Sequence, residues 1–420
     1  MEEMQNNDMS IIQSHNNDKE LKREFNKGMA MGIVIAVLLM VLFVLGKRTF
    51  TIYSNMLSGS IDYEDKAQLI YDTLKEHYVD DIGEDELYEG IFSGMVNYTT
   101  DQYSYYIPAE SYEDFVSGTS GEYVGIGIVV SVDENENIAI QYVMEGSPAE
   151  AAGILPGDIL VAVDGVEASL ENYYDVIDMV KGEEGTTVDI KIYRPDQALT
   201  LEKTVERANI DTVTVSSAMM DDGIGYIRIS EFDSVTYDQF KAALNELNSQ
   251  GMKGVIMDVR DNPGGLLTSV TAVLDELLSE GIITYTEDKY GNKEYEYSTG
   301  DGIDIPVVVL TNGLSASAAE LFTAALKDRG VGSVVGETTY GKGIVQTTFP
   351  LSDGSAVKIT TAKYYTPSGV CIQGVGVEPD YEIKALPDFE LPYMASGTAE
   401  LSDNDIQLDK AVEILEGEIQ

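Results

Sequence analysis

A serine lies where an apolar, strand-like segment runs into a predicted helix, in the sequence TNGLSASAAE at residues 311–320. The hydroxyl of Ser317 would lie near a helix N-terminus, where unpaired N–H groups and the helix dipole favour developing negative charge. The segment is also typical of helix capping, with Ser315 or Ser317 as the N-cap and Glu320 completing a capping box. Taken alone, it favours the cap over the nucleophile.

A serine nucleophile needs a base, and histidine, the usual one, is scarce in this chain. His15 precedes an apolar segment, and His77 lies in a context typical of a solvated helix face. A lysine can serve as the base where burial lowers its pKa enough to leave it neutral. Lys342, bracketed by glycines in ETTYGKGIVQ at 337–346, is the candidate, although a lysine in so acidic a protein more often pairs with a carboxylate. Gln346 could hold its amine through the side-chain carbonyl.

A pair of glycines forms the third element, in the sequence DVRDNPGGLL at residues 258–267. Gly264 and Gly265 follow a predicted strand, so either could present a backbone N–H to an oxyanion. An ordinary turn is the alternative interpretation of the same residues. The lone cysteine, Cys371, excludes a disulfide framework and a cysteine-rich metal site, and no histidine could activate it as a nucleophile.

The formal net charge of the chain is −47, and the residues after 48 hold 20 basic against 67 acidic side chains. Such a surface repels phosphate backbones, so we expect no nucleic-acid partner and no tight docking on anionic lipid. Solubility is the simplest reason for the excess. The chemistry predicted here needs no metal and no cofactor.

One apolar segment is long enough to span a membrane. Residues 28–46 (GMAMGIVIAVLLMVLFVLG) form an uncharged run of 19 residues, and a helix of about that length nearly matches a hydrocarbon core of about 30 Å. The run has no small-residue cleavage site, so we expect an uncleaved signal anchor. Four basic residues before it, against two after it, place residues 1–27 in the cytoplasm and the catalytic part outside, in a single-pass protein of the cell membrane.

After the anchor, the spacing of apolar residues changes from helical to strand-like along the chain. Residues 62–98 favour two helices broken at Gly83. From about Gly121, strand patterns surround the sequences YVGIGI (123–128) and GSPAEAAGILPGDILVAVDG (146–165), and this unit resembles a bacterial PDZ domain, an α+β fold. That resemblance implies that backbone N–H groups at Gly125, Ile126, Gly127 and Ile128 capture a chain-terminal carboxylate, with the peptide added as a strand. By itself, YVGIGI would be interpreted as a plain edge strand.

Beyond the PDZ unit, strands and helices alternate, which predicts an α/β layer with largely parallel strands. The chain as a whole resembles the C-terminal processing (tail-specific) peptidase family, through the motifs above together with GMVNYTTDQYSYYIP (94–108) and AKYYTPSGVCIQGVGVEPD (362–380). The resemblance implies a crotonase-like protease core and a PDZ unit that delivers and gates substrate. It also implies Ser317 as nucleophile, Lys342 as base, Gln346 as orienting partner, and an oxyanion hole from the N–H of Ala318 with that of Gly264 or Gly265.

The predicted organisation is a cytoplasmic tail (1–27), a transmembrane anchor (28–46), a helical region (47–117), a PDZ domain (118–206), a serine protease core (207–385) and a C-terminal helical segment (386–420). We expect an endopeptidase that captures the exposed, apolar C-terminus of a protein substrate and cleaves upstream of it. The family resemblance further suggests a homodimer. Two alternatives remain: a non-catalytic, membrane-tethered PDZ scaffold, and a signal-peptidase-like Ser/Lys hydrolase.

Overall fold

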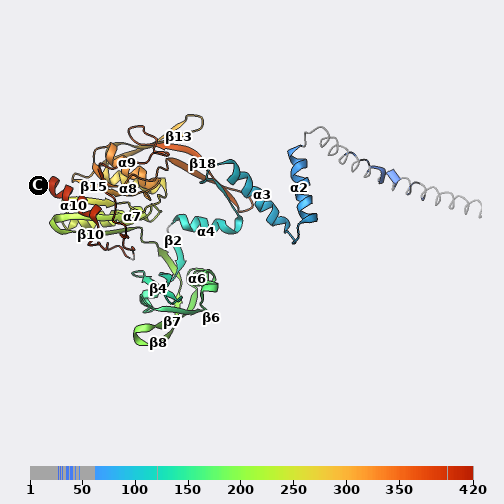
Figure 1. The fold of residues 1–420 in the computed structure, drawn as a ribbon, viewed down its shortest axis with the longest axis horizontal. Helices are drawn as coiled ribbons and strands as arrows, with labels where there is room; N and C mark the ends of the chain where they lie inside the picture. The colour runs from blue at the N-terminus through green and yellow to red at the C-terminus, as the bar shows by residue number, and fades with distance from the viewer. Residues whose placement is uncertain are drawn as a thin grey trace, which may run out of the picture. The chain divides into compact units, whose positions relative to one another are not determined.

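The computed structural model describes residues 62–120, 122–394 and 396–419, together with single positions between 27 and 47 (Figure 1). The predicted cytoplasmic tail, apart from Lys27, and most of the predicted membrane anchor (28–46) therefore lie outside the described residues. Among the residues that are described, no helix is both long and apolar enough to cross a membrane. The described residues fall into two compact units, divided between Ile91 and Phe92.

The described part of the first unit is helical. Helix α2 (Tyr63–His77) has acidic residues in its first turn and Lys75 and His77 in its last, which complements the helix dipole. Helix α3 (Glu84–Thr99) begins in this unit. The rings of Tyr71 and Tyr88 join the two helices at a centroid distance of 6.0 Å. The side chain of His77 is mostly exposed, as its sequence context predicted.

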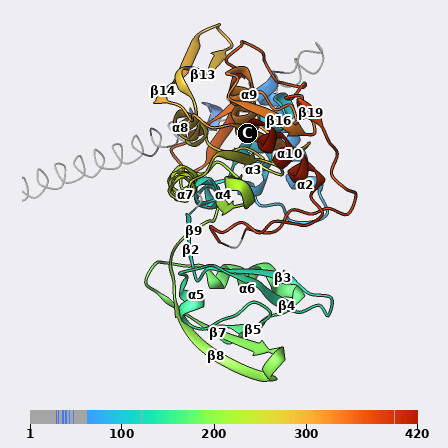
Figure 2. The same ribbon diagram turned by 90° about the vertical axis from the view of Figure 1, so that its left-hand side faces the viewer.

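The second unit contains a PDZ-like sheet between residues 122 and 211. Its strands are β3 (Ile128–Val132), β4 (Ile138–Val143), β5 (Ile159–Val163), β6 (Val166–Glu167), β7 (Thr187–Arg194) and β8 (Leu199–Glu206). Helices α5 (Pro148–Ala151) and α6 (Tyr173–Val180) contribute buried side chains to the core of this domain (Figure 2). Isoleucines and valines fill its core, among them Ile126, Ile140 and Val176. A ribbon of β2 (Glu122–Gly125) and β9 (Ala208–Asp211) leads into and out of the domain.

The protease core contains a six-stranded sheet in the order β10-β11-β12-β15-β16-β19. The strands are β10 (Val215–Met219), β11 (Ile224–Ile229), β12 (Gly254–Asp258), β15 (Val307–Thr311), β16 (Gly332–Gly336) and β19 (Tyr381–Glu382). All neighbours run parallel except β10 and β11. This bears out the predicted α/β layer.

Both faces of this sheet are covered by helices. Side chains alternate between the two faces along a strand, so neighbouring residues pack against different layers. Helices α7 (Thr236–Ser249), α8 (Leu267–Leu277) and α9 (Ala318–Asp328) pack on the face that includes Val255 and Val309. The opposite face, which includes Ile256 and Val308, is covered by the C-terminal helix α10 (Ile406–Ile419).

A second sheet is antiparallel and was not expected from the sequence. It joins β1 (Tyr105–Ile107), β18 (Ala356–Tyr365), β13 (Ser279–Asp288) and β14 (Lys293–Asp301), and β17 (Ile344–Pro350) pairs with β18. Helix α4 (Ala109–Ser120) follows β1. Two segments that matter for the chemistry enter this sheet: Tyr103 lies just before β1, and Lys342 just before β17.

Candidate active site

Ser317 occupies an unusual backbone conformation between β15 and α9. Its φ is 55° and its ψ is −114°, whereas an ordinary N-cap residue lies in the β region. A non-glycine residue held in such a sparsely populated region costs about 1–3 kcal/mol, and such strain is concentrated at functional sites. The next residue, Ala318, is the first of α9, so its N–H has no acceptor within the helix. The turn therefore presents the serine in a way that capping alone does not require.

A buried carboxylate joins the serine turn to the lysine turn. Glu320 is fully buried and accepts the backbone N–H of Ser317 at 2.8 Å and that of Lys342 at 2.7 Å. It also accepts the N–H of Gly341 at 2.7 Å and the hydroxyl of Thr339 at 2.6 Å. The capping role expected for Glu320 is thus one part of a larger one, because the same side chain fixes two segments that are remote in sequence.

Lys342 is partly buried at the edge of the second sheet. Burial lowers the pKa of its amine, as does the charge of Lys358, while Glu320 and Asp101 act in the opposite direction. Its Nζ lies 4.6 Å from the centroid of the Tyr103 ring, a cation–π contact. Within the described ranges, no hydrogen bond joins this amine to the hydroxyl of Ser317.

Gln346 lies on β17 beside an irregularity in the pairing with β18 that falls between Val345 and Gln346. Its amide nitrogen donates to Thr360 Oγ1 at 3.1 Å. Over the part of the chain that is described, its side chain makes no hydrogen bond to Lys342. The structure therefore brings the predicted segments together but does not link the serine, lysine and glutamine side chains by hydrogen bonds.

Tyr364, on β18, holds the backbone of Lys342 in place. Its hydroxyl donates to the carbonyl oxygen of Lys342, and burial, followed by the charge of Glu320, raises the pKa of Tyr364 well above its ordinary value. The hydroxyl therefore stays protonated and can keep donating at any physiological pH.

The glycine loop lies directly against the serine. A Cβ placed on Gly264 would be 2.7 Å from Ser317 Cβ and 2.9 Å from the nitrogen of Ala318. The backbone of Gly264 has a φ of +110°, which side chains other than glycine rarely adopt. Only glycine at this position allows the loop to approach the serine so closely.

The two glycines differ in what their N–H groups do. The N–H of Gly264 donates to Asn262 Oδ1 at 2.8 Å. Phe232 pairs with the loop on either side of Gly265, donating to the carbonyl of Gly264 at 2.8 Å and accepting from Leu266 at 2.6 Å. Among the described residues, no acceptor receives the N–H of Gly265.

A buried ionic cluster supports the start of this loop. The guanidinium of Arg260 is 1% exposed and pairs with Asp258 at 2.5 Å and with Asp405 at 2.7 Å. It also donates to Gln407 at 2.9 Å. Burial alone would raise the pKa of Asp258, but the adjacent guanidinium holds it below its ordinary value. Asp405 and Gln407 of the C-terminal segment therefore hold a residue at the start of the glycine loop.

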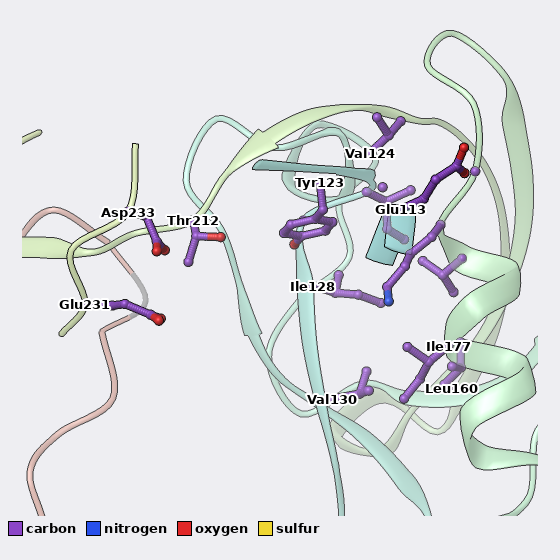
Figure 3. A pocket seen from close by; sticks show the side chains of 16 residues that line it. Glu113, Tyr123, Val124, Ile128, Val130, Leu160, Ile177, Thr212, Glu231 and Asp233 are labelled. Atoms are coloured by element: carbon purple, nitrogen blue, oxygen red, sulfur yellow. The ribbon is translucent and has the colours of Figure 1, made fainter. Parts of the chain in front are cut away.

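The PDZ residues line a cavity of about 880 Å³ (Figure 3). Gly125–Ile128 form one wall, and Val130, Leu160 and Ile177 contribute apolar side chains. The N–H groups of Ile126 and Gly127 have no acceptor among the residues that the structure describes. A Cβ on Gly127 would lie 2.3 Å from Ser147 Cβ, so this turn also requires glycine. The wall thus offers free backbone donors beside an apolar groove.

Comparisons with known proteins agree with this geometry. The sequence model of "Peptidase family S41" matches residues 223–383, that of the "PDZ domain" matches 140–194, and that of the "Activating protease CtpB N-terminal domain" matches 50–111. A carboxy-terminal-processing protease of Bartonella bacilliformis is 33% identical over 83% of this chain and 87% of its own. Carboxy-terminal processing protease CtpA of Bacillus subtilis is 34% identical over 84% of this chain and 76% of its own.

The chain belongs to the carboxy-terminal processing proteases of peptidase family S41. A crystal structure from Bacteroides fragilis, described as an S41 protease, covers 83% of this chain and 97% of its own at 16% identity, with a TM-score of 0.50, and shows the fold alone. The predicted serine peptidase with a PDZ domain is therefore confirmed. No three histidine, cysteine or acidic side chains among the described residues are grouped to hold a metal ion.

Three residues of this site were missed or undervalued by sequence reasoning. Glu320 was interpreted only as a helix cap, and Tyr103 and Tyr364 were quoted in motifs without a role. Neither tyrosine stands in a local pattern that links it to the lysine turn, so a single sequence gives no signal for its contact. The usable signal for Glu320 was its apolar surroundings, since α9 is buried on nearly every side and a charged residue there must be paired.

Proposed function

We propose that this protease cleaves peptide bonds through an acyl-enzyme formed on Ser317, with neutral Lys342 as the general base. The serine hydroxyl attacks the carbonyl carbon of the substrate and passes its proton to the lysine amine. The resulting ammonium then gives the proton to the leaving amine, and water activated by the same lysine releases the acyl group. The observation that carries this proposal is the carboxylate of Glu320, which holds the backbones of Ser317 and Lys342 at 2.8 and 2.7 Å.

The proposed mechanism requires the lysine to move. Its amine leaves the ring of Tyr103 and turns to Ser317, where the side-chain carbonyl of Gln346 orients it. The tetrahedral oxyanion is stabilised by the N–H of Ala318 and that of Gly265. We assign Gly265 this role over Gly264 because Asn262 already accepts the N–H of Gly264.

The PDZ groove is proposed to select the substrate. A chain-terminal carboxylate is received by the backbone at Gly125–Ile128, and an apolar terminal side chain enters the groove near Leu160 and Ile177. The groove thereby delivers the tail to Ser317 and gates its access, and cleavage falls upstream of the captured end.

We further propose that residues 28–46 anchor the enzyme in the cell membrane, with residues 1–27 in the cytoplasm and the protease outside. The length and apolarity of that segment support this topology. A homodimer is proposed as well, because α2 carries no buried side chain and exposes Leu69 and Ile70. We expect the ectodomain without residues 1–48 to sediment as a dimer, and sedimentation as a monomer would contradict this proposal.

The mechanism is tested by cleavage of an unstructured protein with an apolar C-terminus by the full chain in detergent micelles. We expect Ser317→Ala and Lys342→Ala each to abolish cleavage, because each removes one partner of the proton transfer. Lys253→Ala is the matched control, since Lys253 is exposed and its side chain has no partner within the described ranges. Cleavage by Ser317→Ala would refute the mechanism, whereas no cleavage by the wild type would favour the non-catalytic PDZ scaffold.

A further inference from the structure

Two acidic residues of the protease core face the PDZ cavity. Glu231 and Asp233 flank Phe232, and both line the same cavity of about 880 Å³ as the peptide groove, together with Thr212. Figure 3 shows these three side chains on one side of Tyr123, with Ile177 and Leu160 on the other. The cavity therefore extends from the apolar groove to a polar end on the protease core.

The carboxylate of Asp233 has no hydrogen-bond or ionic partner among the described residues, although the residue is buried. The residue is only 4% exposed. Its backbone is satisfied, because its N–H donates to Thr236 Oγ1 at 2.8 Å and its carbonyl accepts the N–H of Thr236 at 3.2 Å. No donor among the described residues reaches the carboxylate. Burial and the adjacent Glu231 raise the pKa of Asp233 to about 7, and burial raises that of Glu231.

A positively charged ligand would relieve this arrangement, since a desolvated carboxylate without a partner is costly and a hydrogen-bonded cation offsets part of that cost. The one basic side chain among the cavity residues is Lys181, and its amine pairs with Asp178 at 3.5 Å. A metal ion is a poor occupant, because no group of three ligating side chains is present in the described part of the chain. The remaining candidate is a cation on a flexible side chain, with Thr212 as an additional acceptor.

The position of the acidic pair suggests which cation this is. Phe232, between the two acidic residues, is hydrogen-bonded to Gly264 and Leu266 of the oxyanion loop. The pair thus lies between the groove that holds the substrate's end and the loop that faces Ser317. A substrate tail bound at both places passes close to the pair.

We propose that Glu231 and Asp233 form a subsite for a lysine or arginine side chain in the substrate tail, between the captured C-terminal residue and the cleaved bond. This inference rests on the proposed function, because it uses the PDZ groove and Ser317 as the two fixed points. It adds a specificity element that an apolar groove lacks: tails with a basic residue at one particular distance from the end are preferred.

The test uses the full chain in detergent and a neutral tail with an apolar C-terminus. A single lysine is placed at each position in turn between the end and the cleaved bond, and the same tails are made with acetyl-lysine. We expect the lysine tail to be cleaved about tenfold faster at one position, because it alone can form a charge-assisted hydrogen bond with the pair; a tenfold ratio corresponds to about 1.4 kcal/mol. The ratio should fall as salt is raised.

Variants separate the pair from the general negative field of the protein. Glu231→Gln with Asp233→Asn should bring the lysine to acetyl-lysine ratio close to one, whereas Glu206→Gln should leave the ratio at its wild-type value. Glu206 is an exposed residue of the PDZ sheet whose side chain has no partner over the described residues. If the double variant does not fold, the single change Glu231→Gln, at the partly exposed member of the pair, replaces it and should lower the ratio.

Binding to the full chain with Ser317→Ala distinguishes the two proposals. Fluorescence anisotropy of the same labelled tails should show the same preference for lysine. A wild type that cleaves all tails with a ratio of one at every position overturns the subsite and leaves the proposed function intact. A wild type that cleaves no tail refutes the proposed function, and the anisotropy ratio then decides on the subsite alone.

Discussion

Replacing Glu320 with glutamine tests whether one carboxylate holds the active site together. Each oxygen of Glu320 accepts two hydrogen bonds, one from Thr339 and Gly341 and the other from Ser317 and Lys342. The amide nitrogen of glutamine cannot accept, so two buried donors lose their acceptor in either orientation. At about 1–3 kcal/mol for each unsatisfied group, the cost is about 2–6 kcal/mol, shared between folding and the geometry of the site.

The assay must separate these two effects. We expect kcat/KM for Glu320→Gln to fall at least about 100-fold, which corresponds to about 2.7 kcal/mol, in protein that remains folded by circular dichroism. Glu337→Gln is the matched control, because Glu337 lies in the same segment and its side chain has no partner within the described ranges, so its effect should stay within about 0.5 kcal/mol. Folded Glu320→Gln with the same kcat/KM as the control would refute the reasoning.

Two further perturbations address the base and the glycine loop. Lys358→Met removes a positive charge that lowers the pKa of Lys342, so the pKa of Lys342 should rise. Because the base must be neutral to act, the part of the kcat/KM profile that rises with pH should move to higher pH. An unchanged profile would contradict the assignment of the base. Gly264→Ala places a Cβ 2.7 Å from Ser317 Cβ and should lower kcat at least about 100-fold, whereas Gly313→Ala, whose Cβ would meet nothing within 4 Å, should have little effect.

The core elements could be predicted because their patterns are strong. Helix α7 shows such a pattern, since Phe240, Leu244 and Leu247 recur at helical spacing and are all buried. The second sheet was missed for the opposite reason. Its hairpin of β13 and β14 carries partly or fully exposed tyrosines among charged residues, as in Tyr295 and Tyr297, which gives no clear alternation of apolar and polar positions.

The site could be predicted in its parts but not in its connections. The serine, lysine and glycine segments each carry local signals, and their combination resembles a known family. The bonds between them are non-local: Glu320 lies 22 residues from the N–H of Lys342, and Arg260 lies 145 residues from Asp405. Local sequence patterns do not predict contacts between residues so far apart in the chain. The contact of Lys342 with Tyr103 depends on the second sheet, which was not predicted from the sequence.

The buried cluster at Arg260 has a consequence for how the enzyme matures. A chain emerging from the ribosome at about 5–20 residues per second would wait about 7–30 s between Arg260 and its partner Asp405, which follows 145 residues later. During that interval the guanidinium lacks one of its two carboxylates. The buried cluster that supports the glycine loop can therefore be completed only after Asp405 has been synthesised.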